Sequence, residues 1–341
     1  MLDQKKSELD GFPEIVLQNL ADKLDIEAML SADSIIDNDG IVVPISPSID
    51  VGLSGGIPEG TWVVLTGEPK TGKTTLALHI MAQFQKPEYG GRNGYYLNIE
   101  GRLKAMNLNS TLGLDRKKFL AITSHKEQIY DAEHYLDAAL SIMKDDPGSV
   151  IIIDSLSALS PSKEQMVNMG DENQMAMMPK MLSKFTRKAN QILPVNKNVI
   201  IGITHIMGNP GFGAAKREKG GYAIAYQADI KLQATHIEKK TIGEKVFGQI
   251  CHWKVLCSAL GAPFGSIPMH IRYGSGVDIL AELVELGVTY GFIVVKGSWY
   301  SYTPDGGEEI KVQGKEKFAA YLEENSLIAD EIYKKIRNLV L

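Results

Sequence analysis

The fold of this chain is decided by the stretch Trp62-Val-Val-Leu-Thr-Gly-Glu-Pro-Lys-Thr-Gly-Lys-Thr-Thr75. The apolar run Trp62–Thr66 predicts a buried strand, and the residues Thr74–Gln85 predict a helix after a glycine-containing turn. The turn fits the pattern G-x-x-x-x-G-K-[ST], which forms a phosphate-binding loop when it connects a strand to a helix. The sequence therefore predicts a site for the phosphates of a nucleotide.

Each residue type in this loop suits that chemistry. Glycines let backbone N–H groups curl around phosphates, and the N-terminal end of the helix adds its positive dipole. Lys73 would reach the β- and γ-phosphates, and the Thr74 hydroxyl would ligate Mg²⁺. The predicted nucleotide contacts in the loop are Gly67, Glu68, Pro69, Lys70, Thr71, Gly72, Lys73, Thr74 and Thr75.

Three further polar residues follow apolar runs. Val150–Asp154 ends in a carboxylate, which predicts Asp154 as the second anchor of Mg²⁺. Glu100 comes at the end of the strand predicted at Tyr95–Ile99, where a carboxylate can polarise an attacking water; the alternative is an ordinary surface glutamate. His205 ends a later strand and could contact the γ-phosphate; the alternative is a hydrogen-bonded structural histidine.

Strands that alternate with helices predict an α/β core with a mainly parallel central sheet. Ser124 with Glu127 has capping-box spacing and predicts the start of a helix within this core. From about Gly276 the pattern changes to a short strand and closing helices, which predict a small α+β C-terminal domain. The expected division is a segment at 1–45 with an amphipathic helix (Leu17–Ala28), a core at 46–275 and a C-terminal domain at 276–341.

Charge is distributed unevenly along the chain. With 36 Lys and Arg against 41 Asp and Glu, the net charge is −5, which at first argues against a nucleic-acid partner. Residues 180–219, however, hold eight basic residues and one acidic residue, a net charge of +7. A basic island in an acidic protein can form a phosphate-binding face; the alternative is a solvated helix face.

A segment at residues 207–221 combines five glycines, three basic residues and Phe212. Such a composition cannot pack a core, yet it can become ordered around a polyanion, with Phe212 as a stacking group. An ordinary flexible loop is the alternative. A second glycine-containing loop is expected at about residues 160–170.

Composition also excludes other classes of protein. No run approaches the ~18–20 apolar residues of a membrane span, and the N-terminus lacks the apolar centre of a signal peptide. Cys251 and Cys257 are too few for a disulfide scaffold and lack zinc-site spacing. We therefore expect a cytoplasmic protein without a membrane partner.

Over about 290 residues, from near Ile45, the chain resembles RecA-family strand-exchange recombinases. The matching stretches, in the order of the family, are Leu53–Gly60, Ile153–Leu159, Gly170-Asp171, Gly208–Pro210, Gly220-Gly221, Ala262–Phe264, Tyr273–Gly276, Trp299–Tyr302 and Gly314-Lys315. His205 stands where cellular members typically have glutamine, and in this it resembles phage recombinases of the UvsX type.

The resemblance implies a RecA-type ATPase that uses ATP and Mg²⁺ and assembles as a helical filament on single-stranded DNA. It further implies strand exchange with homologous double-stranded DNA, a single-strand binding protein and a loading mediator as partners, and the host cytoplasm if the gene is phage-encoded. By position, Glu100, Lys73 and His205 would be catalytic, and Tyr273 would lie against the adenine. The implied DNA contacts are Met169, Gly170, Lys180, Arg187, Met207, Gly208, Asn209, Phe212, Lys216, Arg217, Lys219, Gly220 and Gly221.

The chain also departs from the family pattern shortly before the Ala-Pro-Phe triplet. Bacterial members carry two lysines shortly before the Ala-Pro-Phe triplet, where they act on the neighbouring subunit's ATP. Here these positions are Cys257 and Ala259, and Lys254 is the nearest candidate substitute. The loss leaves open an ATP-binding recombination mediator with little turnover. A hexameric helicase built on the same core is the other alternative.

Overall fold

The computed structural model describes residues 12–24, 26, 29–37, 40–165, 177–207, 217–218, 227–260 and 265–340. The chain divides into two units, residues 1–41 and residues 42–341. The first unit contains α2 (Glu14–Leu24) and α3 (Ala32–Asp37). The predicted amphipathic helix is therefore present up to Leu24, and Ala28 lies outside the described residues.

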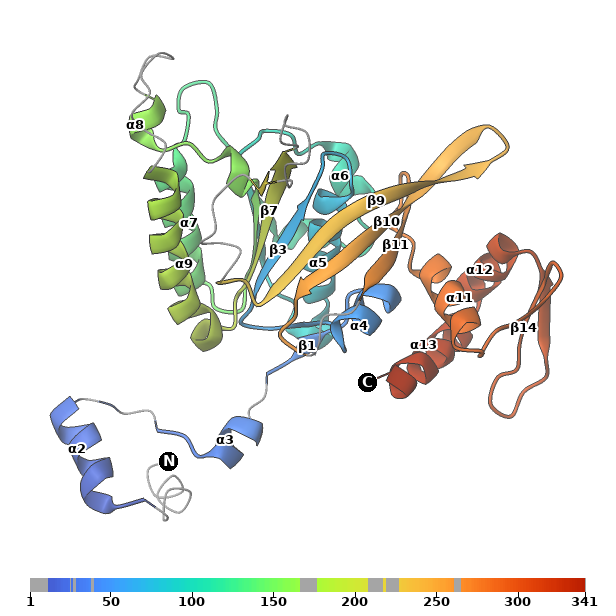
Figure 1. The fold of residues 1–341 in the computed structure, drawn as a ribbon, viewed down its shortest axis with the longest axis horizontal. Coiled ribbons are helices and arrows are strands. Elements are labelled where there is room, and N and C mark those ends of the chain that lie inside the picture. Colours follow the sequence, from blue (N-terminus) through green and yellow to red (C-terminus); the bar gives the residue numbers. More distant parts are fainter. Residues whose placement is uncertain are drawn as a thin grey trace. The chain divides into compact units, whose positions relative to one another are not determined.

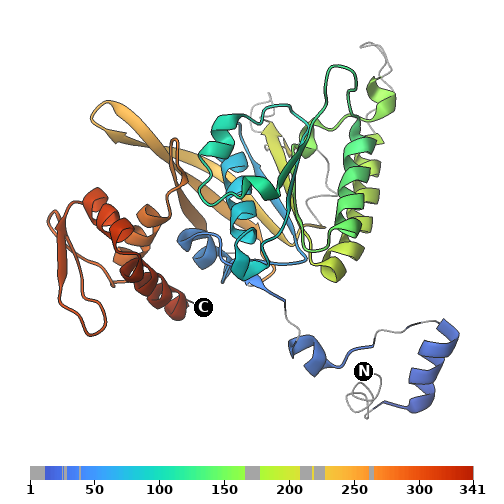
Figure 2. The same cartoon turned by 180° about the vertical axis from the view of Figure 1, so that it is seen from behind.

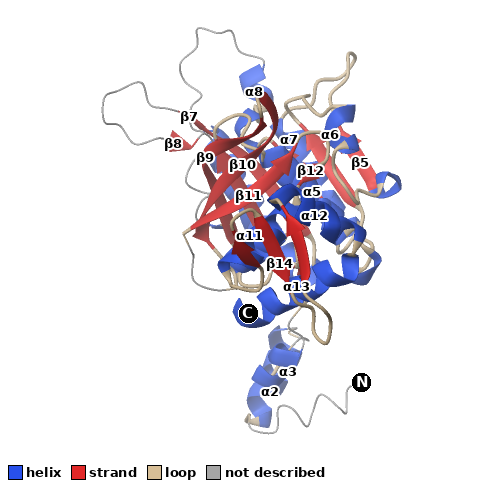
Figure 3. Cartoon of the chain, turned by 90° about the vertical axis from the view of Figure 1, so that its right-hand side faces the viewer, coloured by secondary structure: helices blue, strands red, loops and turns tan. Residues whose placement is uncertain are grey.

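A mixed sheet forms the centre of the second unit (Figure 1). Its strands follow the order β12-β11-β10-β9-β3-β7-β6-β4-β5. From β5 to β9 neighbouring strands pair in parallel, and from β9 to β12 they pair antiparallel. Figure 3 shows β9, β10 and β11 side by side. The strands are β3 (Trp62–Gly67), β4 (Gly94–Asn98), β5 (Phe119–Ile122), β6 (Val150–Asp154), β7 (Val199–Met207), β9 (Ile230–Ile242), β10 (Lys245–Cys257), β11 (Ser266–Arg272) and β12 (Gly276–Val277), with β8 (Arg217–Glu218) paired to β7. The predicted α/β class is confirmed, and the sheet is mixed, with a parallel part and an antiparallel part, where a mainly parallel sheet was predicted.

Helices cover both faces of the parallel part of the sheet. Alternate side chains of a strand point to opposite faces, so Val63 and Leu65 of β3 pack with α5 (Lys73–Phe84). Trp62 and Val64 pack on the other side with α7 (Ala132–Asp145) and α9 (Met177–Asn196), which lie side by side (Figures 1 and 2). Burial on both faces accounts for the nearly continuous apolar runs of β6 and β7.

Shorter elements complete the core. They are β1 (Val42–Val43), α4 (Pro47–Leu53), β2 (Ile57–Pro58), α6 (Ala105–Asn109), α8 (Ser162–Gln165) and the 3₁₀ helices η1 (Pro87–Tyr89), η2 (Arg116–Lys118) and η3 (Leu156–Ala158). In the part of the chain that the structure describes, no helix combines the length and apolar character needed to cross a membrane.

The helix start predicted at Ser124 and Glu127 is wrong. Backbone groups of His125 and Gln128 bond to each other in both directions, at 3.0 and 3.1 Å, which closes a turn where the helix would begin. Asp131 is the actual N-cap of α7, since its carboxylate accepts a hydrogen bond of 2.9 Å from the third N–H of the helix. The capping-box spacing at Ser124 therefore marks no helix.

The C-terminal part packs helices against a small antiparallel sheet, as the α+β prediction requires. Its elements are α11 (Ile279–Thr289), β13 (Val294–Lys296), β14 (Trp299–Tyr302), β15 (Ile310–Gln313), α12 (Lys315–Glu324) and α13 (Ser326–Val340). Two closing helices are present as predicted, and Phe318, Leu322, Ile332 and Ile336 are buried in the core, whereas Leu339 of the same apolar pattern is exposed.

Two buried carboxyl groups join α4 and its flanks to the C-terminal helices. Glu282 of α11 is fully buried and accepts hydrogen bonds of 3.1 Å from the N–H groups of Ser48 and His270. Asp50 of α4 accepts a hydrogen bond from the Tyr333 hydroxyl of α13. Burial raises the pKa of Glu282 to about 8 and that of Asp50 to about 7.

We expect the free energy of unfolding to fall as the pH rises from about 5 to about 8. A raised pKa means that the folded protein keeps protons that the unfolded chain releases above about pH 4.5, so this stabilisation is lost as the pH passes through the folded values. Glu282→Gln cannot ionise and should flatten the decline by at most about 1.4 kcal/mol per pH unit. Urea unfolding at several pH values measures it, with exposed Glu324→Gln as the control. Equal slopes for Glu282→Gln and wild type would contradict the assignment.

Candidate functional site

The loop predicted to bind phosphates connects β3 to α5. Gly72, the N-cap of α5, has φ +85°, and a Cβ there would lie 2.5 Å from Ile271 Cδ1. Gly67 has φ +155°, and its Cβ would lie 2.8 Å from that of Ala234. Both positions therefore require glycine, for conformation and for space. The first N–H groups of α5 have no partner within the helix, which makes this end attractive to anions.

Lys73 is the first residue of α5 and is only 5% exposed. Its Nζ donates hydrogen bonds to the carbonyl oxygens of Gly67 at 3.0 Å and Glu68 at 2.6 Å. Burial lowers the pKa of the amine, and the nearby Asp154 carboxylate acts in the opposite direction. Exchange of the two carbonyls for phosphate oxygens would leave the ammonium group inside the loop.

Thr74 of α5 meets Asp154 at the end of β6. Thr74 Oγ1 donates to Asp154 Oδ2 at 2.9 Å, and the Tyr96 hydroxyl donates to the same oxygen. Burial raises the pKa of Asp154, against the effect of these two hydrogen bonds. A hydroxyl and a carboxylate side by side are the oxygen ligands that Mg²⁺ prefers, so these residues fit the predicted ion.

Glu100 lies in the turn after β4, two residues beyond the last residue of the strand. The N–H groups of Ile99 and Glu100 donate to the carbonyl oxygen of Asp154, at 3.0 and 3.2 Å. These two hydrogen bonds fix the turn to the end of β6. The candidate water-activating carboxylate and the candidate Mg²⁺ ligand are thus held together through the backbone.

The Glu100 carboxylate has three polar neighbours. Its Oε1 accepts a hydrogen bond from Ser155 Oγ at 2.6 Å and lies 2.8 Å from His205 Nε2, and its Oε2 lies 3.2 Å from Arg102 Nη1. Burial alone would raise the pKa of Glu100, but the hydrogen bonds from Ser155 and His205 outweigh it and the pKa is lowered. The carboxylate is therefore ionised at neutral pH.

His205 lies within β7, two residues before its end, and was expected to end the strand. β7 is longer because Ile206 and Met207 pair with Glu218 and Arg217 of β8. The backbone N–H of His205 donates to Ser157 Oγ at 2.9 Å. The strand that carries His205 therefore leads directly to the predicted DNA loop at 207–221.

These groups line one cavity of about 440 Å³ at the carboxyl ends of β3, β4, β6 and β7. Tyr273, predicted to contact adenine, is 53% exposed at this cavity, and its hydroxyl donates to Gln249 Oε1 at 3.0 Å. The lining residues are Pro69, Lys70, Gly72, Lys73, Thr74, Thr75, Glu100, Arg102, Asp154, His205, Gln249, Ile271 and Tyr273. The predicted nucleotide, metal and catalytic residues are thus brought together, with Gly67, Glu68 and Thr71 in the backbone of the loop.

Sequence reasoning missed four polar residues of this site, one of which is Arg102 beside Glu100. Ser155 follows Asp154 directly, and that adjacency could have indicated it. Tyr96 reaches Asp154 because β4 and β6 are neighbours in the sheet, a pairing that no local pattern reveals. Gln249 lies on β10, a strand that was not predicted.

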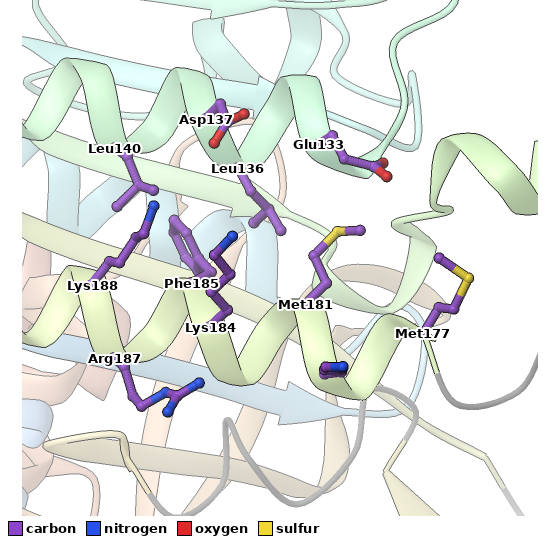
Figure 4. A pocket seen from close by; sticks show the side chains of 11 residues that line it. Glu133, Leu136, Asp137, Leu140, Met177, Met181, Lys184, Phe185, Arg187 and Lys188 are labelled. Atoms are coloured by element: carbon purple, nitrogen blue, oxygen red, sulfur yellow. The ribbon is translucent and has the colours of Figure 1, made fainter.

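The basic helix α9 lines a groove of about 460 Å³ against α7 (Figure 4). Lys180 and Arg187, both implied DNA contacts, are exposed there. Apolar side chains form the floor, and the charged lining residues are Glu133, Asp137, Lys180, Lys184, Arg187 and Lys188. The positive charge of α9 is therefore balanced in part by two carboxylates of α7, and the two DNA contacts remain predictions.

The other implied DNA contacts belong to the two stretches for which the sequence predicts loops. Met207 and Arg217 pair with each other through their backbones at the junction of β7 and β8. The remaining ones lie outside the described residues: Met169, Gly170, Gly208, Asn209, Phe212, Lys216, Lys219, Gly220 and Gly221.

Comparison with known proteins covers both the core and the C-terminal part. Residues 28–278 match the sequence model of the RecA N-terminal domain, and residues 281–341 match that of the RecA C-terminal domain. Protein RecA of Thermotoga neapolitana is 30% identical over 341 residues, which cover 98% of this chain and 93% of that protein. Protein RecA of Solidesulfovibrio magneticus is 30% identical over 309 residues (88% and 83%), and that of Oleidesulfovibrio alaskensis is 30% identical over 302 residues (86% and 82%). Since these matches include the phosphate-binding loop and run through to the last helix, the chain belongs to the RecA family.

Proposed function

We propose that the protein is an ATP-dependent recombinase that forms helical filaments on single-stranded DNA, pairs it with homologous duplex DNA and exchanges strands. The observation that carries this proposal is the 2.8 Å contact between Glu100 and His205. It connects the nucleotide cavity to β7, the strand that leads into the predicted DNA loop at 207–221. Membership of the RecA family supports the same function.

In the proposed mechanism, ATP binds with its phosphates in the loop at 67–74. Lys73 exchanges its carbonyl partners for the β- and γ-phosphates, and its burial strengthens the attraction because little water screens the charge. Thr74 and Asp154 would hold Mg²⁺, which neutralises phosphate charge when bound. The exposed ring of Tyr273 at the cavity suits stacking on the adenine.

Glu100 would orient the attacking water. A carboxylate with a lowered pKa is a weak base, so its contribution is to polarise and position the water. Ser155 and His205 occupy Oε1 and fix the rotation of the carboxylate, which leaves Oε2, beside the exposed Arg102, for the water. Turnover therefore depends on how Glu100 is held as well as on its charge.

His205 would report the state of the γ-phosphate to the DNA loop. Its Nε2 now lies against Glu100, and a γ-phosphate oxygen would compete with that carboxylate for the same nitrogen. The exchange would alter the position of a side chain two residues before the end of β7. Nucleotide state and DNA affinity would be coupled by this route.

Assembly into a filament is proposed from the N-terminal segment. α2 has no buried residue, and Ile15, Val16 and Leu24 expose apolar surface that a neighbouring subunit would cover.

At the positions of the missing interface lysines, Cys257 ends β10 and Ala259 is exposed, while Lys254 is an exposed cation nearby on the same strand. Lys254 remains the proposed substitute.

We further propose that the protein acts in the cytoplasm, with a single-strand binding protein and a loading mediator as its partners in recombination. The phage type rests on His205 alone, and the relatives reported above are bacterial proteins.

Electron microscopy with ATP and single-stranded DNA, paired with a strand-exchange assay, tests the function. Helical filaments with strand exchange support the proposal, and closed rings that unwind DNA indicate a helicase. If neither is observed, a mediator is indicated.

Neutralising Lys216, Arg217 and Lys219 together should reduce the salt dependence of DNA affinity. Three lost phosphate contacts should lower the slope of log affinity against log salt by about 2, since each contact to a single strand contributes about 0.7. Fluorescence anisotropy with labelled single-stranded DNA across a salt series, with ATP present, measures the slope. The matched control neutralises three exposed cations elsewhere, Arg116, Lys117 and Lys144, and should keep it. An unchanged slope in the first variant would indicate that residues 207–221 are an ordinary loop that does not contact DNA phosphates.

A further inference from the structure

We propose that the β9–β10 hairpin carries a binding site for a divalent cation of the zinc class, formed by His236, Glu238 and His252. The site shares no residue with the nucleotide cavity and does not depend on the proposed function.

The register of the hairpin brings the three side chains together. His236 and Glu238 are two residues apart in β9, so their side chains share a face of the sheet. His252 of β10 pairs directly with His236. The next pair is Ala234 with Trp253, so Thr235 is the extra residue of a β-bulge, and bulges turn neighbouring side chains.

The donor atoms already lie close to one another. Glu238 Oε1 is 2.7 Å from His252 Nε2 and 3.5 Å from His236 Nε2, and the three atoms lie within 4.8 Å of one another. Ligand atoms around a tetrahedral zinc ion are about 3.3 Å apart, as zinc–nitrogen and zinc–oxygen bonds of about 2.0–2.1 Å require. The imidazoles are stacked at 3.9 Å and 7°. A turn about one Cβ–Cγ bond, a broad torsion in histidine, would aim both at one ion.

Hydrogen bonds at the opposite ring nitrogens favour metal binding. The Thr235 hydroxyl has one proton, which it donates to the carbonyl oxygen of His252 at 3.0 Å. Its contact of 3.3 Å with His236 Nδ1 therefore needs the proton on the histidine, which leaves a lone pair on His236 Nε2. Ser266 Oγ lies 3.4 Å from His252 Nδ1, where it can accept a hydrogen bond from that nitrogen. Metal-binding histidines usually donate the N–H of their other ring nitrogen to a hydrogen-bond acceptor.

The contact between His252 Nε2 and Glu238 lacks hydrogen-bond geometry. This nitrogen is buried and makes no hydrogen bond, although the carboxylate oxygen is 2.7 Å away. A cation between the imidazoles and the carboxylate would satisfy all three groups. His236 and Glu238 are more than half exposed, at 57% and 56%, so water can complete the coordination.

The donor set selects the type of metal. Two imidazoles and one carboxylate suit Zn²⁺ and similar transition-metal ions, whereas Mg²⁺ and Ca²⁺ take oxygen ligands. The ion would connect β9 to β10 and stabilise the hairpin by binding only its folded form. Mg²⁺ at the nucleotide site would not compete for it.

Zinc titration of the full chain tests the site. Wild-type protein, without nucleotide and with millimolar Mg²⁺, is titrated with ZnCl₂ against a chromogenic chelator. His236→Gln, Glu238→Gln and His252→Gln should each weaken zinc binding at least about tenfold. Thr235→Val, which keeps all three ligands, should also weaken it, and Thr235→Ser should restore it. Zinc should raise the thermal midpoint of the wild type and not that of the ligand variants.

The matched control is His134→Gln. His134 is an exposed histidine with one carboxylate neighbour, Asp131, at 2.7 Å, and its loss should leave zinc affinity unchanged. Ligand variants that bind zinc as the wild type does would overturn the proposal. An equal loss in His134→Gln would do the same, because zinc would then be binding to surface histidines in general.

Discussion

Lys73→Ala is expected to abolish ATP-dependent binding of single-stranded DNA and to lower ATP turnover at least about 100-fold, the loss that follows removal of one preorganised electrostatic group. The ammonium is buried beneath the loop and bonds to its carbonyl oxygens, so it is in place before the phosphates arrive. Lys70 and Arg102 line the same cavity, but both are exposed and cannot supply a desolvated charge. A coupled ATPase assay and anisotropy with and without ATP measure the two effects.

The control for this variant is Lys144→Ala, which removes an exposed lysine from the last turn of α7. It should leave turnover and DNA binding as in the wild type. If Lys73→Ala bound single-stranded DNA with unchanged dependence on ATP, the assignment of the phosphate site would be wrong.

Glu100→Gln is expected to keep ATP and DNA binding while turnover falls by about 10²–10³-fold, the range for the loss of one preorganised electrostatic group. The amide has the shape of the carboxylate, so its oxygen can still accept the hydrogen bond of Ser155 Oγ. What disappears is the negative charge that polarises the water. Filaments on single-stranded DNA should therefore last longer with ATP than those of the wild type.

Single-turnover hydrolysis and filter binding separate the two halves of this prediction. Glu88→Gln, an exposed glutamate in η1, is the matched control and should behave as the wild type. Normal hydrolysis in Glu100→Gln would remove Glu100 from the mechanism. Loss of ATP binding would instead show that the residue holds the site together.

The sequence was informative where the chemistry is local. The phosphate-binding loop lies in one stretch between a strand and a helix, and Asp154 ends a strand, so both could be predicted from neighbouring residues. The contact of Glu100 with His205 joins residues 105 apart and depends on the order of β4, β6 and β7. Local patterns carry no information on strand order, which explains why the two residues were predicted separately.

The antiparallel strands β9 and β10 were not predicted, for a different reason. β9 is buried along its first half and exposed along its second, so no single periodicity runs through it. The turn between β9 and β10 does have a sequence signal, because Gly243 and Glu244 separate two runs of strand-forming residues. In the structure Gly243 has φ +60°, a conformation that favours glycine. The helix start predicted at Ser124 was wrong for a different reason. The spacing of Ser124 to Glu127 matches a capping box, but the backbone groups of His125 and Gln128 bond to each other in a local turn.

The pairing of Met207 with Arg217 has an energetic consequence for DNA binding. Closing a chain of nine residues costs about 2 kcal/mol of entropy by the usual logarithmic dependence on loop length. Because β7 and β8 already hold the two ends side by side, folding bears this cost before any DNA arrives. If the proposed phosphate contacts form between these ends, their free energy would be available for affinity, and we expect that the stretch between them could be lengthened by a few residues with little loss.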